Sequence, residues 1–141
     1  MFTDSITPKA LAVLRLLMAE PLLGSFRLVG GTALALMKGH RLSVDLDLFI
    51  SGKQLSPKLE MLFRDVFGMT SMVSGEDGAI LSGVVDGVKV DLVAYPHPWL
   101  DEPGVDDGSR IAALSDIATM KVSAAGQRGS KKDFFDLAEL L

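Results

Sequence analysis

The sequence contains no cysteine, and this absence excludes disulfide bridges and thiolate metal sites. No apolar run approaches the roughly 20 residues of a membrane-spanning helix, and the N-terminus lacks the basic-then-apolar pattern of a secretory signal. The net charge of −4 argues against a protein that coats nucleic acid, but a nucleotide or a nucleic-acid end stays open as a substrate. We therefore expect a cytoplasmic protein that does not act at a membrane.

Two nucleotide-binding motifs and one calcium motif are also missing. Neither the dinucleotide pattern GxGxxG nor the P-loop pattern GxxxxGK[ST] occurs in the chain. An EF-hand would need an oxygen ligand at the loop position that Phe49 occupies. Any phosphate or metal site must therefore be built in another way.

The 141 residues are enough for one domain, residues 1–141, whose apolar spacing mixes helices with strands. Helices are predicted from Pro8 to before Pro21, over 32–38, 57–66 and 115–125, and from about 132 onward. Strands are predicted at 26–29, 44–50, 69–74, 79–85 and 88–95, with residues 96–108 as loop. This order favours an α+β fold in which helices pack against a mixed sheet of about five strands. Because the chain stops inside a helical pattern, we expect a C-terminal helical extension to be absent or very short.

Two aspartates lie one residue apart in SVDLDLFI (43–50), which otherwise reads as a buried strand. Side chains alternate between the faces of a strand, so Asp45 and Asp47 point the same way, about 7 Å apart. A third lone acid, Asp91, stands in the apolar strand VKVDLVAY (88–95). Buried carboxylates need a counter-charge, and oxygen ligands suit Mg²⁺ or Mn²⁺ rather than zinc. A solvated sheet face is the alternative for any single aspartate, but the three together predict a two-metal site for phosphoryl transfer.

A pair of glycines precedes the first two acids. Gly30 and Gly31 are predicted to form a tight turn whose backbone N–H groups approach an anion, and Thr32 then begins a helix. A purely structural turn is the alternative. The short connection from Thr32 to the acids would return the chain to the same edge of the sheet, which places phosphates beside metals. Arg41 in the returning loop is predicted to contact phosphate, whereas His40 is expected at the surface or as a helix-end cap.

Basic residues occur late in the chain. Lys121 lies about one and a half turns into an apolar helix that Ser115 is predicted to cap, where a lysine that extends to the surface is an equal alternative to a functional one. Arg128, Lys131 and Lys132 form the only basic cluster. This cluster is either a solvated loop or a contact for RNA or phosphate.

Several of these residues together resemble a known group of enzymes. Gly30-Gly31-Thr32, then SVDLDLF and later Asp91 resemble the polymerase-beta-like nucleotidyltransferase superfamily. The longer string LVGGTALAL…GHRLSVDLDLF and the tail DIATMKVSAAGQRGSKKDFFDL (116–137) are similar to its AbiEii/AbiGii-type toxin branch. The resemblance covers nearly the whole chain, although family members usually carry a larger helical C-terminal part.

The resemblance implies a role for each matching residue. Asp45, Asp47 and Asp91 would bind Mg²⁺ or Mn²⁺, and Asp91 would also help to activate the acceptor hydroxyl. Asp133 would lie near the acceptor or the metal. The remaining residues would hold the triphosphate, namely Gly30, Gly31, Thr32, Arg41, Ser43 and Lys121. The partners implied are an NTP, an RNA, protein or small-molecule acceptor, and a cognate antitoxin.

Three functions therefore follow from the sequence. The first is a metal-dependent nucleotidyltransferase that moves NMP from an NTP to an acceptor, as the toxin of a toxin–antitoxin pair. The second is a non-catalytic module that binds a nucleotide or a partner. The third is a phosphatase that resembles the haloacid-dehalogenase group, with Asp45 as nucleophile and the pair Asp133 and Asp136 as later acids. The third leaves the two glycines without a role.

Overall fold

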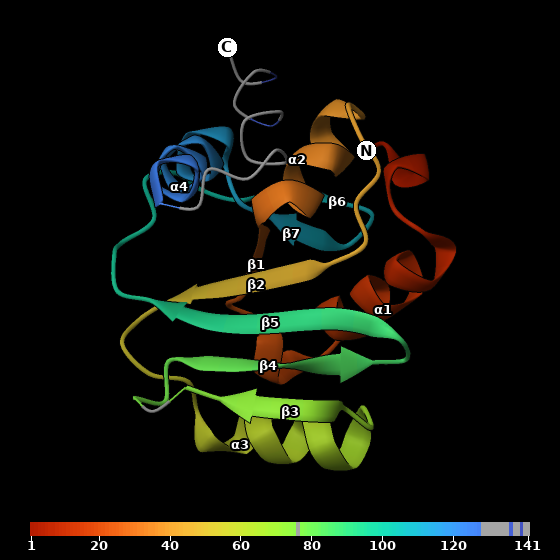
Figure 1. The fold of residues 1–141 in the computed structure, drawn as a ribbon, viewed down its shortest axis with the longest axis vertical. Helices are drawn as coiled ribbons and strands as arrows, with labels where there is room; N and C mark the ends of the chain where they lie inside the picture. Colours follow the sequence, from red (N-terminus) through yellow and green to blue (C-terminus); the bar gives the residue numbers. More distant parts are fainter. Residues whose placement is uncertain (76, 128–135, 137–138, 140–141) are drawn as a thin grey trace.

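The computed structural model describes residues 1–75, 77–127, 136 and 139. Its centre is a single sheet of seven strands in the order β3-β4-β5-β2-β1-β7-β6 (Figure 1). β2 runs parallel to β5, β1 runs parallel to β7, and the other neighbours are antiparallel. The predicted α+β fold with a mixed sheet is confirmed. The strands are β1 (Arg27–Val29), β2 (Leu46–Ser51), β3 (Thr70–Ser74), β4 (Ile80–Val85), β5 (Val88–Tyr95), β6 (Gly104–Asp106) and β7 (Ser109–Ile111).

The number of strands was predicted as about five, and this was wrong. The two additional strands, β6 and β7, form a hairpin in and just after the segment that was predicted as loop. Asp107 and Gly108 connect them with positive φ angles of 52° and 73°. An Asp-Gly pair in this conformation is a typical two-residue hairpin turn. Strands of three residues are too short to show an alternating pattern, so the turn was their main signal.

The helices begin and end where the sequence supplies caps. They are α1 (Pro8–Met18), α2 (Gly30–Lys38), α3 (Pro57–Met61) and α4 (Leu114–Gln127), with two 3₁₀ turns, η1 (Thr3–Ser5) and η2 (Pro21–Leu23), and a π-helical segment η3 (Leu62–Val66) that continues α3. The Thr7 hydroxyl accepts the Ala10 N–H at the start of α1, and Gly39 with φ of 65° ends α2. The helix predicted from about residue 132 onward lies mostly outside the described residues.

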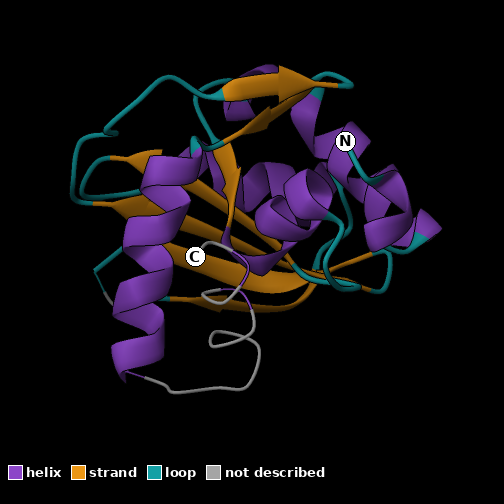
Figure 2. Cartoon of the chain, turned by 90° about the horizontal axis from the view of Figure 1, so that it is seen from above, coloured by secondary structure: helices purple, strands orange, loops and turns teal. Residues whose placement is uncertain are grey.

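The sheet has one apolar face and one mixed face. The apolar face carries Leu28, Leu46, Leu48, Val90 and Leu92, all 1% exposed or less. Helix α1 packs across β5 and β7, and α2 packs against β1 and β2. Figure 2 shows the helices near the N-terminus on one side of the sheet. The opposite face of β2 and β5 carries the side chains between these leucines and valines, and the predicted acids are among them.

Within the described part of the chain, every helix is too short or too polar to cross a lipid bilayer.

Candidate active site

Asp47 and Asp91 are direct neighbours across the parallel strands β2 and β5. Residues paired in this way point to the same face, so their two carboxylates lie side by side on the mixed face of the sheet. Asp45 precedes β2, which begins at Leu46 rather than at the predicted residue 44. Both Asp45 and Asp47 are half-buried. The strand register therefore brings two predicted metal ligands together and leaves the third at the entrance to β2.

The electrostatics of the pair show that it needs positive charge. The pKa of Asp47 is raised from 3.8 to about 7, mainly by burial and then by the charge and hydrogen bond of Asp91 and the charge of Asp45. Lys89 opposes this rise only in part. Two carboxylates that share a hydrogen bond must hold a proton or a cation between them. Among the residues that the structure describes, however, no three carboxylate or imidazole side chains are already arranged to hold one metal ion.

The two glycines lie at the junction of β1 and α2. They were predicted to form a turn before a helix that starts at Thr32, but α2 itself begins at Gly30. Gly30 has φ of 73°, and a Cβ there would lie 2.8 Å from Asp47 Oδ2. The backbone at Gly30 therefore approaches the acid pair closely, and only glycine adopts this conformation easily. Val29 provides no side-chain cap for the first N–H groups of α2.

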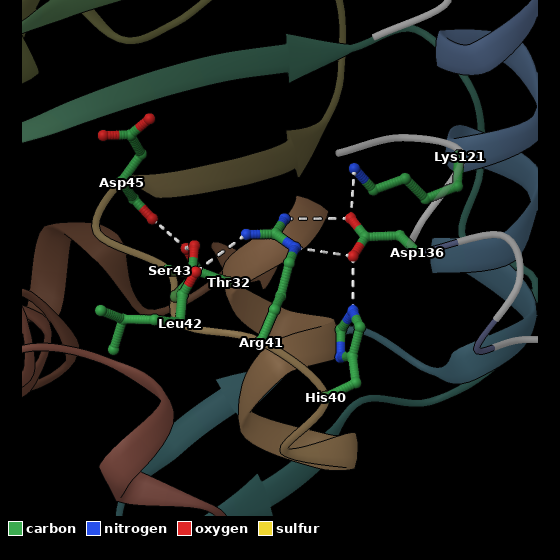
Figure 3. Close-up of polar contacts among 8 residues, drawn as sticks. All are labelled: Thr32, His40, Arg41, Leu42, Ser43, Asp45, Lys121 and Asp136. Atoms are coloured by element: carbon green, nitrogen blue, oxygen red, sulfur yellow. Dashed lines mark hydrogen bonds and ion pairs between the residues drawn. The ribbon is translucent and has the colours of Figure 1, made fainter. Parts of the chain in front are cut away.

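Thr32 and Ser43 bind within the protein. The Thr32 hydroxyl donates to the backbone carbonyl of Asp45 and lies 2.6 Å from the Ser43 hydroxyl oxygen. Both residues are buried, at 2% and 7% exposed. The contacts hold the chain that enters β2 against the first turn of α2 (Figure 3). In this structure the two hydroxyls therefore position Asp45.

Asp136 is the centre of a buried ionic cluster with His40, Arg41 and Lys121 (Figure 3). Arg41 Nε and Nη2 lie 2.9 and 3.0 Å from the two carboxylate oxygens, Lys121 Nζ lies 2.8 Å away and His40 Nε2 lies 2.5 Å away. Asp136 is 0% exposed. Burial alone would raise the pKa of Asp136, but hydrogen bonds from Arg41, Lys121 and His40 outweigh it and hold the pKa well below its usual range.

This ionic cluster touches the start of α2 at Gly31. A Cβ at Gly31 would overlap Arg41 Nη2 and would lie 3.2 Å from Asp136 Oδ2. The missing side chain thus makes room for the guanidinium and the carboxylate beside the first turn of the helix. The cluster therefore brings the side chains of Arg41 and Lys121 together around one carboxylate next to the N-terminus of α2.

A family model for "Nucleotidyl transferase AbiEii toxin, Type IV TA system" matches residues 12–141 of this chain. The chain belongs to the AbiEii nucleotidyltransferase toxin family. An uncharacterized protein of Aquifex aeolicus (strain VF5) is 38% identical over 120 residues, which are 79% of this chain and 55% of that relative. This AbiEii-family chain thus spans about half the length of the curated relative that it matches.

Solved structures confirm the fold of this AbiEii-family chain. The Megavirus polyadenylate synthase matches 92% of it with a TM-score of 0.64 and 14% identity, over 30% of the synthase. An antigenic nucleotidyltransferase-like protein from Paracoccidioides brasiliensis matches 95% with a TM-score of 0.61 and 18% identity, over 76% of that protein. At these identities the likeness concerns the fold alone.

The sequence missed two residues of the buried ionic cluster in this AbiEii-family chain, His40 and Asp136. His40 was expected at the surface or as a helix-end cap, but its ring lies against the buried carboxylate. Asp136 was considered only as one of a pair of acids in the phosphatase alternative, and Asp133 was chosen as the site residue. Asp133 lies outside the described residues, as do Arg128, Lys131 and Lys132. The contact between Arg41 and Asp136 spans 95 residues, so no local pattern could predict it.

Proposed function

We propose that this protein is a metal-dependent nucleotidyltransferase that moves NMP from an NTP to an acceptor hydroxyl. The observation that carries the proposal is the Asp47–Asp91 carboxylate pair, which lies beside the glycine start of α2. An acid pair for metals next to a helix N-terminus for phosphates is the arrangement that phosphoryl transfer needs. Membership of the AbiEii family supports the same reaction.

The acids suit a hard divalent cation. Asp47 and Asp91 share a hydrogen bond and an unfavourable charge, and they offer only oxygen donors, so Mg²⁺ or Mn²⁺ fits them better than zinc. Asp45 is the third proposed ligand, because its charge already acts on Asp47. When bound, such ions neutralise the phosphate oxygens and clamp the attacking and leaving groups.

The chain's own groups would perform the remaining steps. The first N–H groups of α2, at Gly30, Gly31 and Thr32, bind the triphosphate, and Arg41 and Lys121, which contact Asp136 beside Gly31, attract it. Ser43 supports Thr32 in this role. The acceptor oxygen forms a bond to the α-phosphorus while the bond from that phosphorus to the bridging oxygen of pyrophosphate breaks. Asp91 takes the proton of the acceptor hydroxyl.

We further propose that the protein acts as a toxin that a cognate antitoxin neutralises, with RNA as the acceptor. The family description supports the toxin role. Its test is expression in a bacterial host: the parent is expected to stop growth, and Asp47→Asn is expected to permit it. Asp133 is proposed near the acceptor, and its substitution is expected to reduce transfer without loss of NTP binding.

One observation favours a second candidate, a non-catalytic module that binds a nucleotide or a partner. Arg41 and Lys121, which would hold phosphates in an enzyme, are both already paired with Asp136. The phosphatase alternative has less support, because its nucleophile would stand at the C-terminal end of a strand and Asp45 precedes β2.

Incubation with each α-labelled NTP, total RNA and Mg²⁺ separates the two candidates. The parent is expected to label the RNA and to lose this activity in EDTA. Asp47→Asn and Asp91→Asn are expected to lower transfer by at least about a thousandfold, because the metals lose their fixed position. Asp65→Asn, an exposed aspartate on η3, is the matched control and is expected to retain full activity.

The outcomes point in different directions. NTP binding without transfer to any RNA or protein would make the non-catalytic module the better conclusion. Transfer that survives Asp47→Asn would remove the acid pair from the mechanism.

A further inference from the structure

The face of the sheet that carries the acids continues into an aromatic surface. Phe49 follows Asp47 at the next position on the same face of β2, about 7 Å farther along the strand. Tyr95 occupies the equivalent face at the end of β5. The two ring centroids are 5.8 Å apart with an angle of 38° between their planes, and His97 packs against Tyr95 at 4.9 Å. Phe49 and Tyr95 are half-buried, so the rings are supported from below and reachable from solvent.

A cation and a fourth ring extend this surface across β1. Arg27 is the register partner of Phe49, so its side chain points to the same face. Its guanidinium carbon lies 4.4 Å from the centroid of the Trp99 ring, and Nη1 donates to the Asp101 carbonyl at 2.8 Å. Tyr95, Phe49, Arg27 and Trp99 thus form a continuous row of flat groups across β5, β2 and β1. We refer to these four residues as the aromatic row.

A pocket of about 420 Å³ opens at the β1 end of the aromatic row. Arg27, Trp99, Ser51 and Arg110 are among its lining residues. The Arg110 guanidinium donates to the carbonyls of Met18, Leu23 and Phe26, which fix it without neutralising its charge. The pocket therefore combines an indole ring, two guanidinium groups, hydroxyl groups and one acid, Glu102. Its volume lies within the roughly 300–1,000 Å³ typical of small-ligand sites.

The position of the aromatic row indicates which of the two substrates it would contact. The start of α2 meets Asp47 at the beginning of β2, whereas the aromatic row crosses the later part of β2. The acid pair lies between them. Phosphoryl transfer places the attacking and leaving oxygens in line on opposite sides of phosphorus. If the triphosphate lies at α2, the acceptor must approach from the aromatic row.

We propose that the aromatic row binds unpaired bases at the 3′ end of a single-stranded RNA acceptor, with the neighbouring pocket taking one base or its phosphate. This inference rests on the proposed function. Half-buried flat rings with one accessible side suit stacked bases, and the guanidinium groups of Arg27 and Arg110 suit the phosphates between them. A protein acceptor would present no such series of flat rings. The net charge of −4 does not oppose this, because only the end of the strand is held.

Binding of a short, unstructured RNA in EDTA tests the aromatic row without the reaction. Trp99 is the only tryptophan, so RNA binding is expected to quench its fluorescence directly. In anisotropy measurements with labelled RNA, Phe49→Leu and Tyr95→Leu are each expected to raise Kd about tenfold, because each removes one stacking surface. Phe67→Leu is the matched control, a half-buried ring that pairs with Phe63 on η3 and is expected to leave Kd unchanged.

Steady-state transfer separates this inference from the proposed function. Phe49→Leu and Tyr95→Leu are expected to raise KM for RNA and to leave KM for the NTP unchanged. If the parent transfers NMP to RNA while these variants change neither Kd nor KM for RNA, the aromatic row is not the acceptor site and the proposed function stands. If RNA quenches Trp99 and the variants weaken binding but no transfer occurs, the aromatic row is an RNA-binding surface and the proposed function fails. RNA that leaves Trp99 fluorescence unchanged while a protein becomes labelled would overturn the inference.

Discussion

The Asp47–Asp91 pair destabilises the metal-free protein at the pH at which an enzyme would use it. Asp47 has a pKa of about 7 in the fold, so the folded state holds a proton that the unfolded state has already lost above about pH 4. Stability should therefore fall as pH rises through the window from about 4 to about 7. The full penalty, at most about 4 kcal/mol, applies above that window.

Asp47→Asn tests whether the charge of Asp47 lowers the free energy of unfolding. In EDTA at pH 8 the variant is expected to be more stable than the parent by about 1 to 4 kcal/mol, because the burial and repulsion of one charge are removed. At pH 4 the difference should vanish, since Asp47 is already protonated in the fold. Urea unfolding at both pH values provides the measurement, with Asp65→Asn as control. Marked destabilisation by Asp47→Asn at pH 8 would mean that Asp47 accepts internal hydrogen bonds that the fold needs.

Asp136 has the opposite effect on stability. Its lowered pKa means that its contribution is present above about pH 4 and is lost only as pH falls through the lowered value. Asp136→Asn is expected to cost roughly 3 to 5 kcal/mol of unfolding free energy between pH 5 and 8, because Arg41, Lys121 and His40 lose their shared carboxylate.

A surface ion pair provides the comparison for Asp136. Arg15 and Asp107 lie 2.7 Å apart but are both exposed, and asparagine suits the turn at position 107. Asp107→Asn is therefore expected to cost less than about 1 kcal/mol. Equal losses in Asp136→Asn and Asp107→Asn would show that the buried ionic cluster does not stabilise the fold.

At the scale of elements, the first turn of α2 depends on a missing side chain. Gly31→Val would push the Arg41 guanidinium away from Asp136 and would place bulk where phosphate is proposed to bind. We expect NTP affinity, measured by calorimetry with Mg²⁺, to fall at least about tenfold. Gly104→Val is the control, since the nearest atom to its Cβ is 4.0 Å away and valine suits a strand. Unchanged affinity in Gly31→Val would exclude the phosphate role of this turn.

The two Asp-Gly hairpins show which elements the sequence could predict. Asp86-Gly87 joins strands of six and eight residues with clear alternation, and this hairpin is confirmed. Asp107-Gly108 has the same turn chemistry, but its strands have three residues each and were missed. The α2 boundary was misplaced by two residues for a different reason. Glycine is a poor helix former, and the contacts with Asp47 and Arg41 that favour it here are not visible in the sequence.

At the scale of the molecule, the sheet brings together residues whose proximity the sequence could only suggest. The pairing of Asp47 with Asp91 follows from parallel strands in register, and alternation within each strand predicted the shared face. The role of Asp136 required knowledge of where its carboxylate lies relative to Arg41 and Lys121, which no periodicity encodes. Local sequence patterns thus pointed to the acids and the glycines. The carboxylate of Asp136, which pairs with Arg41 and Lys121, was visible only in the three-dimensional structure.

During protein synthesis, Asp136 is made after the three residues that it contacts. His40, Arg41 and Lys121 all leave the ribosome before Asp136, and 95 residues separate Arg41 from its partner. At about 5 to 20 residues per second, this separation corresponds to roughly 5 to 20 s of translation. For most of that interval the Arg41 side chain lacks its carboxylate partner, and Lys121 is added only 15 residues before Asp136. The buried ionic cluster beside the first turn of α2 cannot form until Asp136 is made, so its contacts are expected to be among the last of the described fold to form.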